Sequence, residues 1–133
     1  MARDRSGRRG EALVAAHLGS IGWTVLARRL HVGRDEIDLL AVDPGPPRAV
    51  VVVEVRTRTS SRYGTAEESV DRRKIARLYR AAAALRALGT LPGGAPLPRG
   101  PWRVDVLTVD DAPAIAPGAG GPTIRHHRAV EPG

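Results

Sequence analysis

Two carboxylates and an arginine stand in apolar surroundings near the middle of the chain. Glu54 interrupts the valine run "VVVVEVRTR", Arg56 follows it, and Asp38 lies in the apolar stretch "DEIDLLAV". Side chains alternate across a strand, so Glu54 and Arg56 point to one face if this segment is extended. Two neighbouring acids raise each other's pKa unless a cation lies between them. The pattern therefore predicts a cation-binding site or, alternatively, a structural ion-pair network with Arg56 or Arg58.

A divalent cation, Mg²⁺ or Mn²⁺, would relieve the repulsion between Asp38 and Glu54. Mg²⁺ prefers oxygen ligands and typically takes one or two carboxylates together with waters and substrate phosphate. It can polarise a phosphate and acidify a bound water, and a cationic side chain beside it stabilises developing charge. The three residue types therefore suit metal-dependent hydrolysis of a phosphodiester. The site depends on strand register, because a slip of one residue would place the two acids on opposite faces.

The strands that would carry these residues are predicted from apolar runs bounded by turn residues. The turn "DPGPPR" should join the second and third strands into a hairpin. The β-branched run of the third strand indicates burial on both faces, at the centre of the sheet. The expected strands cover residues 23–30, 36–42, 49–56, 102–109 and, as a short edge strand, 123–130.

Two helices complete the predicted fold. The first runs from about residue 8 to residue 21, with Ser6 as its N-cap. The second covers residues 67–88, and its apolar residues recur at three- and four-residue spacing, which is typical of a core-facing stripe. The order of helices and strands predicts an α/β domain around a mixed sheet.

The connections divide the chain into one domain and a C-terminal extension. We expect residues 57–65 to form a polar loop and residues 89–101 to form a long flexible connection. A single domain would cover residues 1–110, followed by a flexible Pro/Gly spacer at 111–122. Residues 123–133 would form a C-terminal segment that carries the edge strand.

Composition narrows the class of protein. The chain has 133 residues and a formal charge of +7, and Lys74 is the only lysine among 21 basic residues. Such a domain attracts polyanions, so nucleic acid is the first partner to consider, although a merely soluble basic surface would look the same. The absence of cysteine excludes disulfides and thiol nucleophiles and fits a reducing cytoplasm. We expect neither a membrane span nor a secretory signal.

Several segments together resemble one protein family. "GRRGEALVAAHLGSIGWTVLARR", "GRDEIDLLAV", "VVVVEVRTR", "YGTAEESVDRRKIARL" and "WRVDVLTVD", in this order, are similar to the YraN family (UPF0102), small bacterial proteins of the PD-(D/E)XK nuclease-like superfamily. The closing "IRHHRAV" is also similar. The resemblance implies a restriction-endonuclease-like αβββαβ core with a central mixed sheet flanked by helices. The nuclease activity of the family is itself inferred from fold similarity to archaeal Holliday-junction resolvases and restriction-type endonucleases.

The resemblance assigns roles residue by residue. Asp38 matches the metal-binding aspartate of the superfamily, and Glu54 matches the acidic ligand in the next strand. Glu11, on the first helix, matches the glutamate that several members add to the metal site; alternatively, it is a helix acid favoured by the macrodipole. Arg56 departs from the pattern, because "E-V-R" stands here where the family has "E-V-K".

The position of the lysine matters for the chemistry. Lysine can shift its pKa and orient a water, whereas arginine stays protonated but binds phosphate well through its planar fork. Arg56 would then clamp the phosphate and stabilise the transition state. Lys74 lies early in the second helix and would repair the motif if that helix faces the same cleft. Equally, Lys74 is an exposed residue on a polar helix face.

Basic residues near the site are candidates for phosphate contacts that give affinity without sequence readout. A solvated basic surface explains each of them nearly as well. His126 and His127 would point to opposite faces of a strand, which favours an edge strand or tail over a metal site. The candidate nucleic-acid-binding residues are Arg28, Arg29, Arg34, Arg58 and Arg62.

Three functions fit these patterns. The first is a Mg²⁺- or Mn²⁺-dependent endonuclease acting on branched or otherwise structured DNA, where the branched substrate rests on fold analogy. The second is a nucleic-acid-binding module that retains the fold without catalysis, for which Arg56 is the best support. The third is an adaptor for a protein partner, which no particular residue supports. Junction resolution needs two sites, so a two-fold homodimer would suit the first function.

Overall fold

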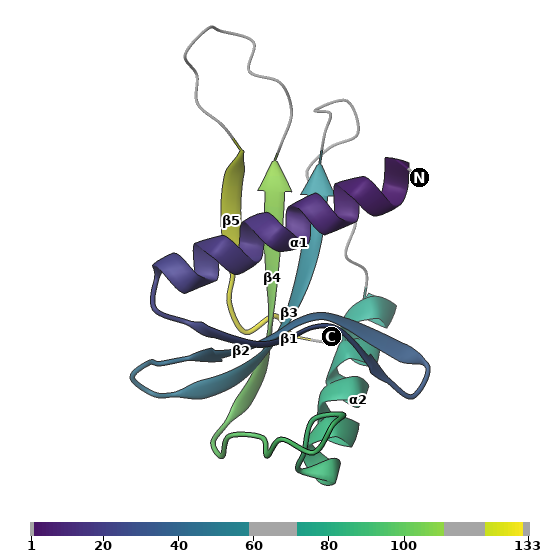
Figure 1. The fold of residues 1–133 in the computed structure, drawn as a ribbon, viewed down its shortest axis with the longest axis vertical. Helices are drawn as coiled ribbons and strands as arrows, with labels where there is room; N and C mark the ends of the chain where they lie inside the picture. Colours follow the sequence, from purple (N-terminus) through teal and green to yellow (C-terminus); the bar gives the residue numbers. More distant parts are fainter. Residues whose placement is uncertain (1, 59–71, 111–121, 132–133) are drawn as a thin grey trace, which may run out of the picture.

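The computed structural model describes residues 2–58, 72–110 and 122–131, and it folds them in the predicted αβββαβ order with one further strand (Figure 1). The α/β fold class expected from the sequence is confirmed. Neither helix in the described part of the chain is long and apolar enough to span a membrane. The elements are α1 (Ala2–Ser20), β1 (Thr24–Val32), β2 (Asp35–Asp43), β3 (Ala49–Arg58), α2 (Arg72–Leu88), β4 (Trp102–Asp110) and β5 (Thr123–His127).

The strands form a five-stranded mixed sheet in the order β1-β2-β3-β4-β5. The pairs β1–β2, β2–β3 and β4–β5 are antiparallel, whereas β3 and β4 run parallel. The third strand lies at the centre, and its valines from Val50 to Val53 are almost completely buried. This position explains why a continuous β-branched run, without polar alternation, forms β3.

The two helices cover opposite faces of the sheet. Val50 and Val52 pack in one core cluster with α2, while Val51 and Val53 pack in another with α1. Successive strand residues point to opposite faces, so Glu54 and its neighbours at even positions share the face that α2 covers. Figure 1 shows α1 crossing β3, β4 and β5, with α2 at the other side of the molecule.

The hairpin of β2 and β3 has the register on which the predicted site depends. The ladder pairs Asp43 with Ala49 at the turn and ends with Leu39 opposite Val53. One step beyond this last pair, Asp38 lies level with Glu54. The predicted hairpin is therefore confirmed, and its register is the one that the predicted site requires.

Several boundaries differ from the expected ones. Helix α1 begins at Ala2, so Ser6 lies within the helix and is not its N-cap. Strand β5 ends at His127 and not at residue 130, because Ala129 adopts a left-handed φ of 51° that interrupts the extended backbone. Strand β3 continues to Arg58, into the loop expected at 57–65. The rest of that loop lies outside the described residues, as does the start of the second helix before Arg72. Residues 111–121 of the expected spacer also lie outside them.

The connection from α2 to β4 is a folded loop and not the flexible connection expected. The Leu91 amide donates to the Ala95 carbonyl at 2.8 Å, and the Leu97 amide donates to the Gly89 carbonyl at 3.0 Å. Leu97 also packs against the core cluster beneath α2. These contacts fix residues 89–101 despite the abundance of proline and glycine.

Candidate functional site

The carboxylates of Asp38 and Glu54 meet on the face of the sheet that α2 covers. They share a hydrogen bond, and Asp38 Oδ2 also accepts a 2.9 Å hydrogen bond from the Val55 amide. The Val55 amide lies just past the end of the β2–β3 ladder. It therefore donates to the side chain of Asp38 where, within the ladder, it would donate to a backbone carbonyl of β2. Glu54 is 2% exposed. The local backbone thus holds the buried acid Glu54 and the half-buried acid Asp38 together.

Asp38 is a weak acid in this setting. Burial, followed by the hydrogen bond and negative charge of Glu54, raises the pKa of Asp38 from 3.8 to about 8. The Val55 amide and the Lys74 ammonium oppose the rise but do not cancel it. Like-charged neighbours in a desolvated place cannot both ionise without a cation. At neutral pH Asp38 therefore keeps its proton.

Two cations approach the same oxygen of Glu54. Arg56 Nη2 and Lys74 Nζ each lie 3.5 Å from Glu54 Oε2. Within the described residues, Glu54 Oε2 and Arg56 Nε are nevertheless buried without a hydrogen-bond partner. Buried polar atoms without a hydrogen-bond partner are rare in folded proteins, and each one needs an explanation. Here two of them lie in one cluster of acids and bases.

Lys74 reaches the acids from α2. It lies in the first turn of this helix, one residue before Ile75, whose side chain is buried in the core beneath the helix. Of the two alternatives left open by the sequence, the structure favours the one in which the second helix faces the acids. An ammonium thus stands beside Glu54 although the strand carries arginine where the family pattern has lysine.

Glu11 does not join the other two acids. Its Oε2 accepts a 2.9 Å ion-paired hydrogen bond from Arg29 Nε of β1. Its helix, α1, covers the face of the sheet opposite to the face of Glu54. Among the described residues, no group of three or more His, Cys, Asp or Glu side chains could hold a metal ion. The three-acid site implied by the resemblance is thus not assembled in this conformation.

Asp38 and Glu54 alone fit a divalent cation. Glu54 Oε2 has no hydrogen-bond partner among the described residues and is an oxygen donor of the kind that such a cation takes. Mg²⁺ commonly binds through one or two carboxylates and completes its shell with water and phosphate. The chemistry of the pair matches that need, and these two residues would hold the ion.

The predicted phosphate-binding arginines are scattered relative to the acid pair. Arg28 on β1 and Arg34 in the β1–β2 turn are exposed. Arg29 pairs with Glu11 and adopts a left-handed φ of 49°. The side chain of Arg58 and the whole of Arg62 lie outside the described residues.

A second polar cluster, which the sequence reasoning missed, surrounds Asp105 on the α1 side. The carboxylate of Asp105 is fully buried and accepts from Arg103 Nε at 2.9 Å, from Arg103 Nη2 at 3.1 Å and from the Ala129 amide at 2.9 Å. His126 Nε2 lies 2.8 Å from Asp105 Oδ2. The signals were the acid within the apolar run "WRVDVLTV" and the exposed-looking pair of histidines.

This cluster holds the C-terminal segment against the sheet through hydrogen bonds and ion pairs. Arg103 also bonds Asp43 at 2.7 Å, and its guanidinium lies 5.4 Å from the ring centroid of Trp23. Arg128 reaches both Asp43 and the same indole. Burial raises the pKa of Asp105, but the bonds from His126, Arg103 and the Ala129 amide outweigh it and hold the pKa below 3.8. Both oxygens of Asp105 are satisfied, which is the mark of a structural acid and contrasts with Glu54.

The comparison with protein families agrees with the resemblance seen in the sequence. The model of an uncharacterised protein family, UPF0102, matches residues 10–109. The chain belongs to the UPF0102 family. A UPF0102 protein of Arthrobacter sp. (strain FB24) is 39% identical over 130 residues, covering 97% of this chain and 98% of the relative. One from Deinococcus radiodurans is 40% identical over 104 residues, covering 78% and 79% of the two chains.

The UPF0102 match includes both acids, both cations beside them and Glu11, whereas β5 lies beyond it. A UPF0102 protein of Frankia casuarinae, 37% identical over 129 residues, covers 97% of this chain and extends over that strand. Membership establishes the family and leaves the reaction to be argued from the site.

Proposed function

We propose that this UPF0102 protein is a Mg²⁺- or Mn²⁺-dependent endonuclease that hydrolyses phosphodiester bonds in structured or branched DNA. One observation carries the proposal: the buried carboxylate of Glu54 and the half-buried carboxylate of Asp38 are hydrogen-bonded to each other, while Glu54 Oε2, approached by two cations, has no hydrogen-bond partner among the described residues. In a purely structural pair, every carboxylate oxygen would be expected to have a hydrogen-bond partner, as both oxygens of Asp105 do. The resemblance to the PD-(D/E)XK superfamily and the charge of +7 support the choice of nucleic acid as substrate.

Each residue has a role in this scheme. Asp38 and Glu54 would hold the cation, which when bound would act as a Lewis acid toward a phosphate oxygen and toward water. Arg56 would bind the phosphate through its planar fork and stabilise charge that develops in the transition state. Lys74 would orient the attacking water or donate to the phosphate, because its ammonium already stands at the acid pair. Glu11, paired with Arg29, has no role in this conformation.

The alternative is a nucleic-acid-binding module that keeps the fold without the chemistry. Two observations favour it: Arg56 replaces the lysine of the family pattern, and Glu11 is held by Arg29 away from the acid pair.

Cleavage of defined substrates separates the two. Purified protein is incubated with labelled four-way junction, flap, single-stranded and linear duplex DNA in Mg²⁺, Mn²⁺ or EDTA. We expect metal-dependent cleavage of the branched substrates, abolished by Asp38→Asn and by Glu54→Gln and unchanged by Glu36→Gln, an exposed acid on β2. Cleavage that survives both active-site substitutions would exclude this site, and binding without cleavage in every metal would favour the alternative.

Junction cleavage also implies two active sites. A two-fold homodimer would place one at each of two symmetric strands. Light scattering of the protein with and without junction DNA measures this directly, and a strictly monomeric complex would argue for a single-site substrate such as a flap.

A further inference from the structure

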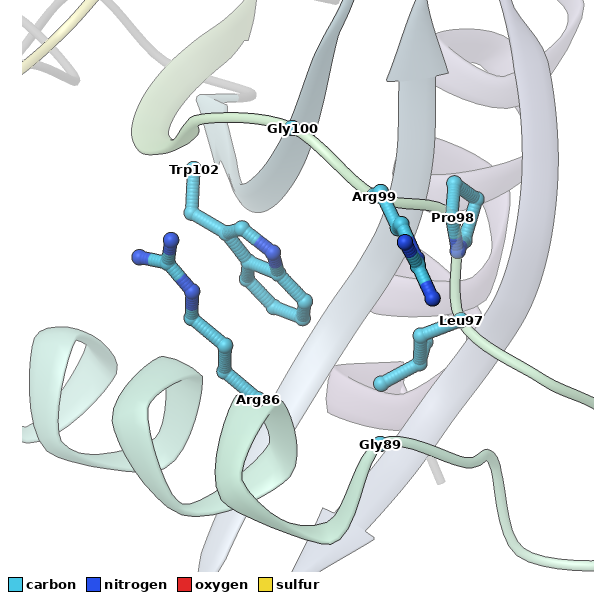
Figure 2. Close-up of a pocket in the computed structure, with 7 residues that line it drawn as sticks. All are labelled: Arg86, Gly89, Leu97, Pro98, Arg99, Gly100 and Trp102. Carbon is cyan, nitrogen blue, oxygen red and sulfur yellow. The ribbon is translucent and has the colours of Figure 1, made fainter.

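A hollow at the far end of α2 combines an aromatic ring with uncompensated positive charge. It has a volume of about 340 Å³ and is lined by Trp102, Arg86, Arg99, Leu97 and Pro98, with two glycines. Figure 2 shows the indole of Trp102 between Arg86, which rises from α2, and the side chains of Leu97 and Arg99. A second hollow of about 550 Å³ shares Arg86 and Trp102 as lining residues and is otherwise lined by Tyr79 and alanines.

The charges of this hollow are not neutralised by the protein. No acidic residue lines either hollow. Within the described ranges, the side chains of Arg86 and Arg99 form neither a hydrogen bond nor an ion pair. By contrast, Arg80 on the same helix pairs with Asp35, and Arg103 on β4 pairs with two acids. The two exposed guanidinium groups are therefore available to an anion.

The aromatic ring is held rigidly. Trp102 begins β4, where it pairs with Val50 of β3, and the Val50 amide donates to the Pro101 carbonyl at 2.9 Å. Trp102 is partly buried against the core beneath α2. The hydrogen-bonded loop before it carries Arg99. A fixed ring with one accessible edge or face binds a planar ligand without first losing side-chain freedom.

The hollow lies on the same side of the sheet as the acid pair, and α2 connects them. Lys74 is in the first turn of this helix and Arg86 is in its last turn. A rise of about 1.5 Å per residue separates the two by about 18 Å along the helix axis.

We propose that the Trp102 hollow is a second nucleic-acid site, which stacks an unpaired base on the indole while Arg86 and Arg99 bind the flanking phosphates. Stacking on an aromatic ring beside cations is how proteins hold single strands without reading their sequence. The site would capture the unpaired strand of a substrate whose scissile phosphate lies near Lys74. The inference rests on the proposed function only for the choice of nucleic acid as the ligand, and it does not require cleavage.

Binding of a fluorescein-labelled 12-nucleotide thymidine strand, measured by anisotropy in EDTA, tests this without any chemistry. We expect Trp102→Leu to weaken binding by about 5- to 100-fold, since one base stack contributes that much. Trp102→Phe keeps a ring and should stay within about threefold of wild type. Arg86→Ala should weaken binding and reduce the slope of log K against log salt by about 0.7, the value for one phosphate of a single strand. Arg8→Ala removes an exposed charge from α1, on the opposite face, and should leave the stacking intact.

Tryptophan fluorescence gives a second readout. Trp23 is 6% exposed, so quenching by the bound strand should come from Trp102 and should disappear in Trp102→Phe, a variant that still binds. This keeps the test valid if Trp102→Leu fails to fold.

Four results would overturn the inference. The first is that folded Trp102→Leu and Arg86→Ala bind the thymidine strand as tightly as wild type, and the second is that quenching persists in Trp102→Phe. The third is that binding of blunt duplex DNA depends on Trp102 to the same extent. The fourth is that unlabelled polyglutamate displaces the labelled strand as effectively as the unlabelled thymidine strand does. None of them bears on the cation site, whose own test is metal-dependent cleavage, so the two failures are distinguishable.

Discussion

Lys74 and Glu54 come from different elements, yet the ammonium nitrogen of the lysine lies 3.5 Å from Oε2 of the glutamate. Arg56 Nη2 lies at the same distance from the same oxygen. Helix α2 thus supplies the lysine that strand β3 lacks. The substitution of arginine within the family pattern does not remove an ammonium from the site; the ammonium is presented by another element.

The first prediction concerns this lysine. Lys74→Met should lower the rate of metal-dependent cleavage by about 10²-fold or more, in the range found when one group that stabilises transition-state charge is removed. Arg73→Met removes an exposed charge from the preceding position of α2 and should change the rate little. Single-turnover cleavage measures both variants, and a fully active Lys74→Met would show that the ammonium is structural.

Arg56 should contribute mainly to phosphate binding. Because Lys74 already provides an ammonium, Arg56→Lys should lose the planar fork and raise KM, with kcat within about tenfold of wild type. Arg56→Met should lower both kcat and kcat/KM. The steady-state parameters of the two variants decide this, and a higher kcat in Arg56→Lys would mean that the arginine handicaps the enzyme.

The raised pKa of Asp38 should make the metal-free protein less stable as pH rises from about 4 to about 8. This pKa is about 8 in the folded chain and 3.8 as a free side chain. Between these values the folded state holds a proton that the unfolded state releases, so the free energy of unfolding decreases as pH rises through this window. Asp38→Asn cannot ionise. In EDTA its melting temperature should therefore exceed that of wild type by several degrees at pH 8, with a smaller difference near pH 4.

Melting curves at several pH values measure this difference, with Glu36→Gln as the control for loss of one negative charge. A difference between Asp38→Asn and wild type that is the same at pH 5 and pH 8 would contradict the assignment of the raised pKa to Asp38.

Low pH should destabilise the protein through the Asp105 cluster, which lies on the face of the sheet opposite to Asp38 and Glu54. The pKa values of Asp105 and Asp43 lie below 3.8 in the folded state, because for each acid hydrogen bonds and cationic neighbours outweigh the effect of burial. Their stabilisation is complete above about pH 4 and is lost as pH falls through the lowered values. Asp105→Asn leaves cations without their buried partner and should reduce the free energy of unfolding by about 3–5 kcal/mol at pH 7.

Urea unfolding at pH 7 and pH 3 checks this prediction. The difference between wild type and Asp105→Asn should be smaller at pH 3, and a difference that does not change with pH would show that the cluster does not depend on the charge of the acid.

The convergence of Asp38 and Glu54 could be predicted because it depends on local rules. The short turn fixes the hairpin, and strand alternation then fixes the face of each side chain. The place of Glu11 could not be predicted, since helical periodicity does not say which face of the sheet a helix covers. Lys74 was undecided for the same reason, because packing of α2 alone turns its first residues toward β3.

The Asp105 cluster shows another limit. Its members come from the end of β2, from β4, from β5 and from the segment after β5, so their meeting depends on the order of strands across the sheet. The buried acid in "WRVDVLTV" was a visible signal, but its partners His126 and the Ala129 amide are close to it only because β5 pairs with β4. The ordered loop at 89–101 was missed because composition alone predicted flexibility.

Titration with Mn²⁺ tests the central claim most directly, with the free-ion signal followed by electron paramagnetic resonance in the absence of DNA. We predict that the wild-type protein and Glu36→Gln bind one Mn²⁺ with the same affinity, and that Asp38→Asn and Glu54→Gln each weaken binding at least tenfold. Mn²⁺ bound equally well by folded Glu54→Gln, or no binding by the wild type at millimolar Mn²⁺, would contradict the assignment of this acid pair as a cation site.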